Sequence, residues 1–476
     1  MASLSSATSR AGRERSMAHV VMFVYNDCTS DQRVLREAET LTSVGHRVTI
    51  IARAPAPGSR IPMREVRAGV EIVRLAAPTS WRAKWLMIRY PWRTGRDRLG
   101  SLARAVRAHQ LRLADGSAAA LLAILAAWSV VRLPFYVIER RRRRSGGSTL
   151  DWLVSWRFAI IGWANEAARA APPADVWHGH DLTGLPGAVE GRRLHGGLVV
   201  YDSHELFVES GSNARRPGWA KWLLRRLERT LSRSADALVT VNQTLADKLD
   251  REYGFRRVVI LHNTPNRWDR PTMPDDRLRA AAGIEPGTPV ALYHGGFSGD
   301  RGLVPLAEAM LSPGLEGCHL VYLGFGELRK RLLDLAAETR FGGRIHVLEA
   351  VPPDELLAWV ASADVGVMPN QPATANERLS TPNKLFESLA AGIPVVTSDF
   401  PERRRIVLDD PAGPLGAVCD PTDPLSIGTA IRSIVSLDPA ARADLRRRCL
   451  AAAHERWNWE TESRRLVDLY ADLTGG

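Results

Sequence analysis

Apolar runs alternate with amphipathic stretches along most of the chain. The first run, residues 20–24, precedes a segment whose apolar residues recur at helical spacing, and a second run begins at residue 48. Apolar strands that alternate with amphipathic helices are typical of a parallel sheet covered by helices on both faces. Further runs in this half of the chain predict strands at 175–178, 198–201, 237–241 and 258–261. We therefore expect one doubly wound lobe that ends near residue 262.

The second half repeats this alternation after a polar, proline-rich stretch at 262–276, which we interpret as a linker. The predicted strands are 290–294, 319–323, 345–348, 365–368 and 395–397, and the predicted helices are 303–310, 328–338, 354–362 and 382–391. Lobes of this kind bind ligands beyond the carboxyl ends of their strands. The predicted fold class is therefore α/β, with two Rossmann-like doubly wound lobes that face a central cleft.

One segment, at about 81–169, breaks the rhythm and predicts a helical insertion rich in arginine and tryptophan. Its apolar centre, 118–131, is shorter than the ~20 residues that span a bilayer. It can be interpreted as a buried helix of an enlarged first lobe. It can equally be an interfacial anchor, with the arginine run 140–144 on anionic lipid. No aromatic-rich RNA motif accompanies the arginines, so we expect no nucleic-acid partner.

Composition narrows the class of protein. The chain has 476 residues, 45% of them hydrophobic and 24% charged, as in folded proteins of more than one domain. A formal net charge of +12 suits substrates that carry phosphate, or an anionic membrane surface. The four cysteines show no metal-ligand spacing, and the polar first residues lack the apolar core of a signal peptide. We therefore expect a reduced, cytoplasmic protein.

The segment 380–397, STPNKLFESLAAGIPVVT, is the most specific stretch of the sequence. It predicts a helix opened by Pro382, a stop at Gly392 and a buried strand. The free N–H groups at a helix amino end suit phosphate. Glu387, one turn inside, could accept hydrogen bonds from ribose hydroxyls, and Lys384 could reach an anionic group. In the alternative interpretation, Lys384 and Glu387 are only a surface pair at i,i+3 spacing.

This segment resembles the nucleotide-binding signature of the retaining glycosyltransferases of family 4, which have the two-lobed GT-B fold. Other segments resemble the family in the expected order: DQRV at 31–34, GHRV at 45–48, VWHGHD at 176–181, YDSHE at 201–205, HN at 262–263, YHGG at 293–296, RGL at 301–303, LGFG at 323–326 and ADV at 363–365. The resemblance implies a first, acceptor lobe at 18–262 and a second, nucleotide-sugar lobe at 263–452. A leader at 1–17 precedes them. Residues 453–476 would form a helix that crosses back to the first lobe, or else a plain cap of the second.

The resemblance also implies roles for individual residues. His180 would face the donor sugar, Arg301 would stabilise the departing diphosphate, and Glu387 would hold the ribose, so that these three form the catalytic group. The expected nucleotide-sugar contacts are Gly295, Gly296, Arg301, Gly324, Asn383, Lys384 and Glu387. The expected substrate-binding residues are Arg33, Asp181, His204, Glu205, Asn376 and Glu377.

Two departures from the family pattern affect these expectations. Leu379 stands where the family commonly has a second acidic residue, and Glu377 or Asn376 would then serve the sugar hydroxyls. Gly296 stands where many members have an arginine. Lys384, Arg33 or a backbone nest around Gly295 and Gly296 would compensate. No Asp-x-Asp metal motif stands out, so we expect no metal and no cofactor.

The predicted function is transfer of a sugar, with retention, from a UDP- or GDP-sugar to a lipid-linked or cell-envelope glycan acceptor. A hexosyltransferase-like enzyme of this kind would work in the cytoplasm as a peripheral protein at the inner face of an anionic membrane. Because a fold does not fix a function, a nucleotide-sugar epimerase or hydrolase remains an alternative. A non-catalytic scaffold that binds a nucleotide sugar is a second alternative.

Overall fold

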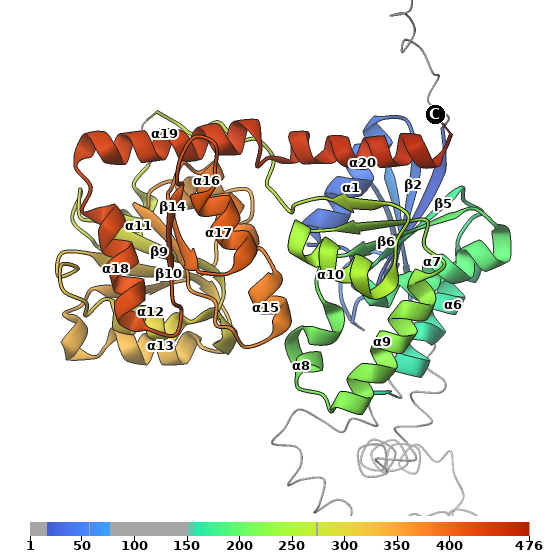
Figure 1. The fold of residues 1–476 in the computed structure, drawn as a ribbon, viewed down its shortest axis with the longest axis horizontal. Coiled ribbons are helices and arrows are strands. Elements are labelled where there is room, and N and C mark those ends of the chain that lie inside the picture. Colours follow the sequence, from blue (N-terminus) through green and yellow to red (C-terminus); the bar gives the residue numbers. More distant parts are fainter. Residues whose placement is uncertain (1–16, 57, 77–151, 154–155, 273–274, 476) are drawn as a thin grey trace, which may run out of the picture.

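The computed structural model describes residues 17–56, 58–76, 152–153, 156–272 and 275–475, which form two lobes side by side (Figure 1). Most of the predicted leader and most of the predicted insertion, including 118–131 and 140–144, lie outside the described residues. Within the described residues, no helix is both long and apolar enough to cross a membrane.

The first lobe is built on an eight-stranded sheet of order β3-β4-β2-β1-β5-β6-β7-β8. Its strands are β1 (His19–Val24), β2 (Arg47–Arg53), β3 (Arg64–Arg67), β4 (Val70–Leu75), β5 (Val176–His180), β6 (Leu198–Ser203), β7 (Ala237–Thr240) and β8 (Val258–Ile260). All neighbours pair in parallel except β3 and β4. The carboxyl ends of β1, β5, β6 and β7 therefore lie at one edge.

Helices cover both faces of this sheet, as the sequence pattern predicts for buried parallel strands. They are α1 (Gln32–Ser43), α6 (Ile161–Ala170), α7 (Asp181–His195), α8 (Gly211–Ala214), α9 (Gly218–Ser232) and α10 (Gln243–Tyr253), with a π-turn η2 (Trp156–Ile160) and a 3-10 turn η3 (Phe207–Glu209). Along β1, Val20 and Met22 pack toward α1, whereas Val21 and Phe23 pack toward α6 and α7. The described end of the predicted insertion, η2 and α6, is helical and buries Trp163.

The second lobe has a six-stranded parallel sheet of order β11-β10-β9-β12-β13-β14. Its strands are β9 (Val290–Gly296), β10 (His319–Phe325), β11 (Ile345–Leu348), β12 (Val365–Met368), β13 (Val395–Ser398) and β14 (Gly416–Cys419). Its helices are α11 (Arg277–Ala282), α12 (Leu303–Ala309), α13 (Arg329–Ala336), α14 (Leu356–Val360), α15 (Ala375–Leu379), α16 (Asn383–Ala390), α17 (Pro401–Leu408), α18 (Pro424–Val435) and α19 (Pro439–Glu455), with 3-10 turns η4 (Gly299–Arg301) and η5 (Thr339–Phe341).

The last two helices join the lobes. Figure 1 shows α19 along the second lobe and α20 (Trp459–Leu473) along the first. Asn458 separates them, and its side chain caps α20 by accepting from the backbone N–H of Thr461. Leu466 and Tyr470 are buried with α1 and β1, and the Tyr470 hydroxyl lies 2.8 Å from Nδ1 of His178 on β5. The end of the chain is therefore part of the first-lobe core.

The α/β fold class predicted from the apolar runs is confirmed. Three strands were missed, β3, β4 and β14. β3 is short, charged and mostly exposed at the sheet edge, so it lacks an apolar run. β14 has only four residues and follows a proline- and glycine-rich loop, so its signal is equally weak.

Candidate active site

A cavity of about 280 Å³ lies between the lobes. The first lobe lines it with the loop after β1, His204, Val241 and Asn263. The second lobe contributes Ser380, Thr381, Asn383 and Phe386, where the chain enters α16. The carboxyl ends of both parallel sheets thus meet at one cleft, where folds of this class bind ligands.

Hydrogen bonds cross directly between the lobes beside this cavity. Asn376 Oδ1 accepts from the backbone N–H of Leu206 at 2.9 Å, and its Nδ2 lies 3.4 Å from Oε2 of Glu205. Asn242 donates to the carbonyl of Leu379 at 2.8 Å. Asn376 and Glu205, predicted as substrate-binding residues, are therefore engaged with each other across the cleft, and the structure is a closed arrangement of the lobes.

The second-lobe side of the cleft is organised by α16. Pro382 is the residue directly before the helix, and Asn383, the first residue of the helix, lines the cavity. Glu387 lies one turn inside, and its Oε2 is 2.9 Å from Nε2 of His294 at the end of β9. Burial raises the pKa of Glu387, but the hydrogen bond and charge of His294 outweigh it and hold this pKa below its ordinary value. Glu387 is thus an oriented carboxylate.

Lys384 lies one turn before Glu387, and the structure does not make them a simple surface pair. Its Nζ donates to the hydroxyl of Tyr293 at 2.8 Å, beside Gly295. Desolvation and the nearby charge of Arg301 lower the pKa of Lys384 to about 7. A half-buried amine of this kind gains most from an incoming anion, because the anion restores the stability of its charged form.

Arg301 lies at the end of η4, across from α15. Its Nη1 is 3.4 Å from Oε2 of Glu377, which also accepts from Asn370 Nδ2 at 2.9 Å. Glu377 is buried, and the hydroxyl of Thr374 caps its helix. Arg301 and Glu377 come from separate predicted motifs, and the structure brings them together.

Two residues of this half were missed by the sequence interpretation. Asn370 follows β12, and its amide fixes the Glu377 carboxylate. Arg403 on α17 is buried and donates to the carbonyl oxygens of Glu377 and Ser380, at 2.9 and 3.2 Å. Arg403 thereby holds the backbone that joins α15 to α16. Neither residue belongs to a recognisable local motif.

Glycines allow the backbone of this half to approach closely. Gly295 and Gly302 have φ of +108° and +70°. A Cβ on Gly302 would overlap the carbonyl oxygen of Pro369, and one on Gly324 would overlap that of Gly295. Gly295 and Gly324 were predicted as nucleotide-sugar contacts. The structure gives both a packing reason, and it leaves open space around the Cα of Gly296.

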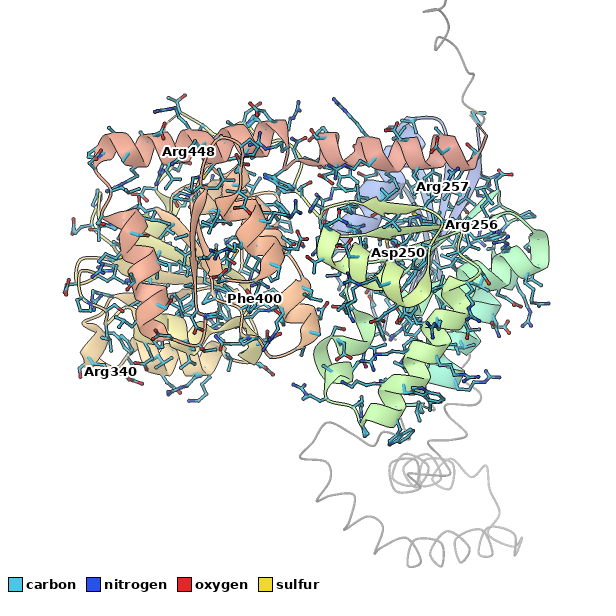
Figure 2. All side chains as sticks on the ribbon, in the orientation of Figure 1. Asp250, Arg256, Arg257, Arg340, Phe400 and Arg448 are labelled. Carbon is cyan, nitrogen blue, oxygen red and sulfur yellow. The ribbon has the colours of Figure 1, made fainter. Side chains whose placement is uncertain are left out.

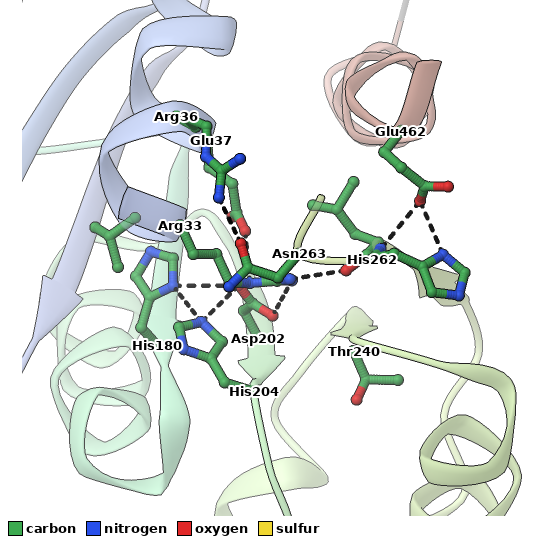
Figure 3. A network of polar contacts seen from close by, with 12 residues as sticks. Arg33, Arg36, Glu37, His180, Asp202, His204, Thr240, His262, Asn263 and Glu462 are labelled. Atoms are coloured by element: carbon green, nitrogen blue, oxygen red, sulfur yellow. Dashed lines mark hydrogen bonds and ion pairs between the residues drawn. The ribbon is translucent and has the colours of Figure 1, made fainter. Parts of the chain in front are cut away.

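The first-lobe side of the cleft is organised by the buried carboxylate of Asp202 at the end of β6 (Figure 3). Arg33 on α1 donates to it through Nε and Nη2, at 3.1 and 2.9 Å. His180 Nδ1 lies 3.2 Å and His204 Nε2 lies 3.0 Å from Oδ2. Arg33 also donates to the carbonyl of Leu261 at 2.7 Å, which ties the network to the start of the linker.

The two histidines of this network differ in charge. Desolvation, with the neighbouring ring of His178, lowers the pKa of His180 to about 3, so His180 is neutral. Desolvation acts on His204 as well, but Asp181 and Asp202 outweigh it and raise the pKa of His204 to about 10. His204 is therefore an imidazolium at neutral pH, and it is the histidine that lines the cavity.

Asp181 follows His180 in a left-handed conformation, with a φ of +54°, which is strained for a residue other than glycine. Its Oδ1 accepts from the backbone N–H of His204 at 3.0 Å, and its Oδ2 lies 3.5 Å from the His204 ring. Burial raises the pKa of Asp181. The strained turn thus fixes the loop after β6 against the end of β5.

Two predicted residues of this half are already engaged within the first lobe. His180 was expected to face the donor sugar, but its ring is 1% exposed and lies behind His204 in the closed arrangement. Arg33 was considered as a compensating charge for the diphosphate. It is buried, its guanidinium is neutralised by Asp202, and its Nε also lies 2.9 Å from Glu37. The physical reason is the same for both residues, since each is bound to Asp202.

Four buried side chains, Glu37, His178, His180 and Asp202, bring potential metal-ligand atoms within 4.8 Å of one another. The guanidinium of Arg33 already supplies a positive charge to this cluster. Its Nε lies 2.9 Å from Glu37 Oε1, and its Nη2 lies 2.9 Å from Asp202 Oδ1. Burial and the neighbouring Asp202 charge raise the pKa of Glu37, which favours its neutral acid. The residues therefore fit a protein-internal ion network better than a metal site.

A larger groove, about 800 Å³, lies between β8 and α20 at the hinge and also borders Arg405 and Trp457. Figure 2 labels Arg257, one of its lining residues, beside α20. No residue predicted for the active site lines this groove, and its arginines Arg405, Arg456 and Arg465 are paired with acidic neighbours. The smaller cavity between the lobes remains the candidate site.

The fold is that of the GT-B glycosyltransferases. Sucrose-phosphate synthase from Thermosynechococcus elongatus superposes with a TM-score of 0.68 at 15% identity, over 96% of this chain and 99% of that one. A family model described as "Glycosyl transferase 4-like domain" matches residues 129–264, and one described as "Glycosyl transferases group 1" matches residues 288–436. The chain belongs to the glycosyltransferases of family 4.

Curated relatives match only part of the chain. The chitobiosyldiphosphodolichol beta-mannosyltransferase of Candida albicans is 23% identical over 253 residues, which are 50% of this chain and 54% of that protein. A GDP-mannose-dependent alpha-(1-6)-phosphatidylinositol monomannoside mannosyltransferase of Mycolicibacterium smegmatis is 29% identical over 151 residues, 32% of this chain and 38% of that protein. The chain thus spans about half the length of the first relative and less of the second.

Replacing Gly302 with alanine is expected to destabilise the second lobe. The left-handed backbone alone costs an alanine about 1–2 kcal/mol, and the added Cβ would also overlap the Pro369 carbonyl. The melting temperature should fall by several degrees in a thermal melt. Gly299→Ala is the matched control, because nothing lies within 4 Å of a Cβ there. Equal melting of the two variants would contradict this packing.

Proposed function

We propose that this chain transfers a sugar from a UDP- or GDP-sugar to a lipid-linked or cell-envelope glycan acceptor. The observation that carries the proposal is the oriented Glu387 carboxylate, one turn from Lys384 on α16, the helix whose first residue, Asn383, lines the cavity. Glu387 Oε2 is held by His294, and Oε1 accepts no hydrogen bond from the described residues. A fixed carboxylate with a free oxygen suits a ribose diol.

The diphosphate of the donor would lie between this carboxylate and Arg301. The amino end of α16 supplies backbone N–H groups and the positive end of its dipole. Lys384 and Arg301 supply charge that strengthens as the nucleoside diphosphate departs. This set supports departure without a metal ion, which is part of the proposal. Gly296 leaves the backbone open to a phosphate at the end of β9.

The sugar would lie toward α15 and the first lobe. Glu377, held by Asn370 and Arg301, offers a carboxylate that could accept hydrogen bonds from sugar hydroxyls. It would replace the acidic residue that the family commonly has at the position of Leu379. His180 would act through the network of Asp202 and His204, unless the lobes open and expose it. Retention of anomeric configuration follows from the family resemblance. The names of the two relatives specify a beta- and an alpha-mannosyl product, so the anomer is a decisive readout.

The acceptor part of the proposal is supported by the same names. One relative acts, by its name, on a chitobiosyldiphosphodolichol and the other on a phosphatidylinositol mannoside, and both of these acceptors carry lipid. A lipid-linked acceptor would place the protein, as a peripheral protein, at the inner face of a membrane. The chain's net charge of +12 suits an anionic surface.

A donor panel tests the transferase directly. Purified protein is incubated with UDP- and GDP-sugars, with and without lipid extract, and release of nucleoside diphosphate is measured together with the anomer of the product. Release should require acceptor. Arg301→Ala should lower kcat/KM by about 10²–10³, and Glu387→Gln by roughly 10- to 100-fold. Glu455→Gln, an exposed carboxylate on α19, is the control.

Each other outcome selects a different function. Conversion of the donor without acceptor would identify an epimerase or a hydrolase. Nucleotide binding with no turnover under any condition would identify a non-catalytic scaffold. An inverted anomer would refute retention while leaving the transferase in place.

The affinity for nucleoside diphosphate should depend on the protonation of Lys384. Its pKa of about 7 in the free protein means that the amine is charged below pH 7 and neutral above it. Because the anion binds the charged form, the Kd for UDP or GDP should rise above pH 7, by up to about tenfold per pH unit. Calorimetry at pH 6.5, 7.5 and 8.5 measures this rise.

Two variants provide the controls for this pH dependence. Lys384→Arg keeps its charge and should bind with little change over this range, whereas Lys384→Met should bind weakly at every pH. Titration of the nucleotide itself is common to all three proteins and cancels in the comparison. The same pH profile in wild type and Lys384→Met would contradict the role given to Lys384.

A further inference from the structure

Helix α9 carries an apolar patch on its outer face. Trp219, Trp222 and Leu223 are 55%, 56% and 39% exposed. Their spacing places them on one stripe of the helix, and the stripe continues with arginines, Arg226, Arg229 and Arg233, all of them exposed. Large exposed side chains that cluster in this way mark interaction surfaces.

The opposite face fixes the orientation of α9. Leu224 packs in the first-lobe core. Glu228 is buried and accepts hydrogen bonds from the hydroxyls of Tyr201 at 2.7 Å and Tyr253 at 2.9 Å. The helix therefore cannot rotate to bury its tryptophans among the described residues of the first lobe.

The arginines of the stripe are available to a partner. Lys221 and Arg225, on the flank of α9, form ion pairs with Glu209. Arg226, Arg229 and Arg233 form no ion pair with any described residue, although Arg226 lies over the ring of Trp222, 5.6 Å from its centre. A surface that combines tryptophan, leucine and unpaired arginine is complementary to lipid headgroups that carry negative charge.

The sequence that precedes Trp152 is strongly basic. The sequence 77–151 contains 15 lysines and arginines, and its acidic residues are Asp97, Asp115, Glu139 and Asp151. The described chain resumes at Trp152, whose indole N–H donates to Asn213 just before α9 and whose ring lies under Arg216. A segment this basic is not the charge complement of the α9 arginines, so an external anionic surface is favoured as their partner.

We infer that the outer face of α9 docks on an anionic phospholipid bilayer. The tryptophans and Leu223 enter the headgroup region, and Arg226, Arg229 and Arg233 bind lipid phosphates. The ion pairs of Glu209 link α9 to η3, which follows the loop that contacts Asn376 in the cleft. Docking through this face would place the cleft beside the membrane. This inference extends the proposal of a lipid-linked acceptor, but its evidence is the surface of α9 and is independent of catalysis.

Flotation of the full chain with vesicles tests the inference. Vesicles of phosphatidylcholine with 30 mol% phosphatidylglycerol contain neither donor nor acceptor, so their binding is independent of any transferase activity. Wild type should float with these vesicles and much less with pure phosphatidylcholine. Trp219→Ala combined with Trp222→Ala should lower partitioning at least about tenfold. Arg226→Glu, Arg229→Glu and Arg233→Glu together should lower it by ~100-fold.

A matched variant controls for loss of charge alone. Arg331, Arg404 and Arg447 are exposed on helices of the second lobe, and their triple change to glutamate should leave vesicle binding close to wild type. Circular dichroism and thermal melts confirm that each variant is folded.

Three results would overturn the inference. The first is a wild type that does not float with anionic vesicles. The second is an α9 variant set that floats as wild type does, which would assign binding to 77–151. The third is conversion of a wild-type dimer to a monomer by the tryptophan changes without an effect on flotation, which would make this face a contact between two copies of the chain.

Discussion

The buried carboxylate of Asp202 is the interaction on which the first lobe depends. It lies at the end of β6 and binds Arg33 from α1, His180 from β5 and His204 from the following loop. Arg33 also donates to the carbonyl of Leu261, just before the linker. His178, two residues before His180 on β5, contacts the hydroxyl of Tyr470 on α20. An unpaired charge at this depth would be costly, so every partner must be in place for the lobe to fold. The geometry of the cleft wall follows from this requirement.

The second-lobe side of the cleft is built around helix α16 rather than around a buried carboxylate. Its half of the cleft presents Asn383, at the amino end of α16, to the cavity, and His294 and Tyr293 hold Glu387 and Lys384 one turn along. Arg403 and Asn370 fix the backbone and the Glu377 carboxylate of the neighbouring helix. The lobes touch through the amide side chains of Asn242 and Asn376 and through Thr244, which donates to Glu402. Leu379 adds an apolar contact with the first-lobe core. Contacts of this mixed, largely polar kind are typical of domains that move relative to one another.

The sequence was sufficient for the fold class and for helix α16 beside the cleft, because both depend on local patterns. Apolar runs predicted the central strands, and the proline, lysine and glutamate of α16 lie on adjacent turns of one helix. The edge strand β3, its neighbour β4 and the Asp202 network were not predicted in this way. Arg33 and Asp202 are far apart in the chain and neither belongs to a local signature of the pair, so only the sheet order β2-β1-β5-β6 brings them together. For the same reason the burial of His180 and the role of Arg403 emerged only from the structure.

The central claim is that the cleft between the lobes is a nucleotide-sugar site. The most direct measurement is a crystal structure of the chain with bound UDP or GDP. The account predicts the ribose at Glu387 and the diphosphate between Lys384, Arg301 and the amino end of α16. A nucleotide bound in the groove between β8 and α20, or one in the cleft that leaves Glu387 and Lys384 without contact, would contradict it.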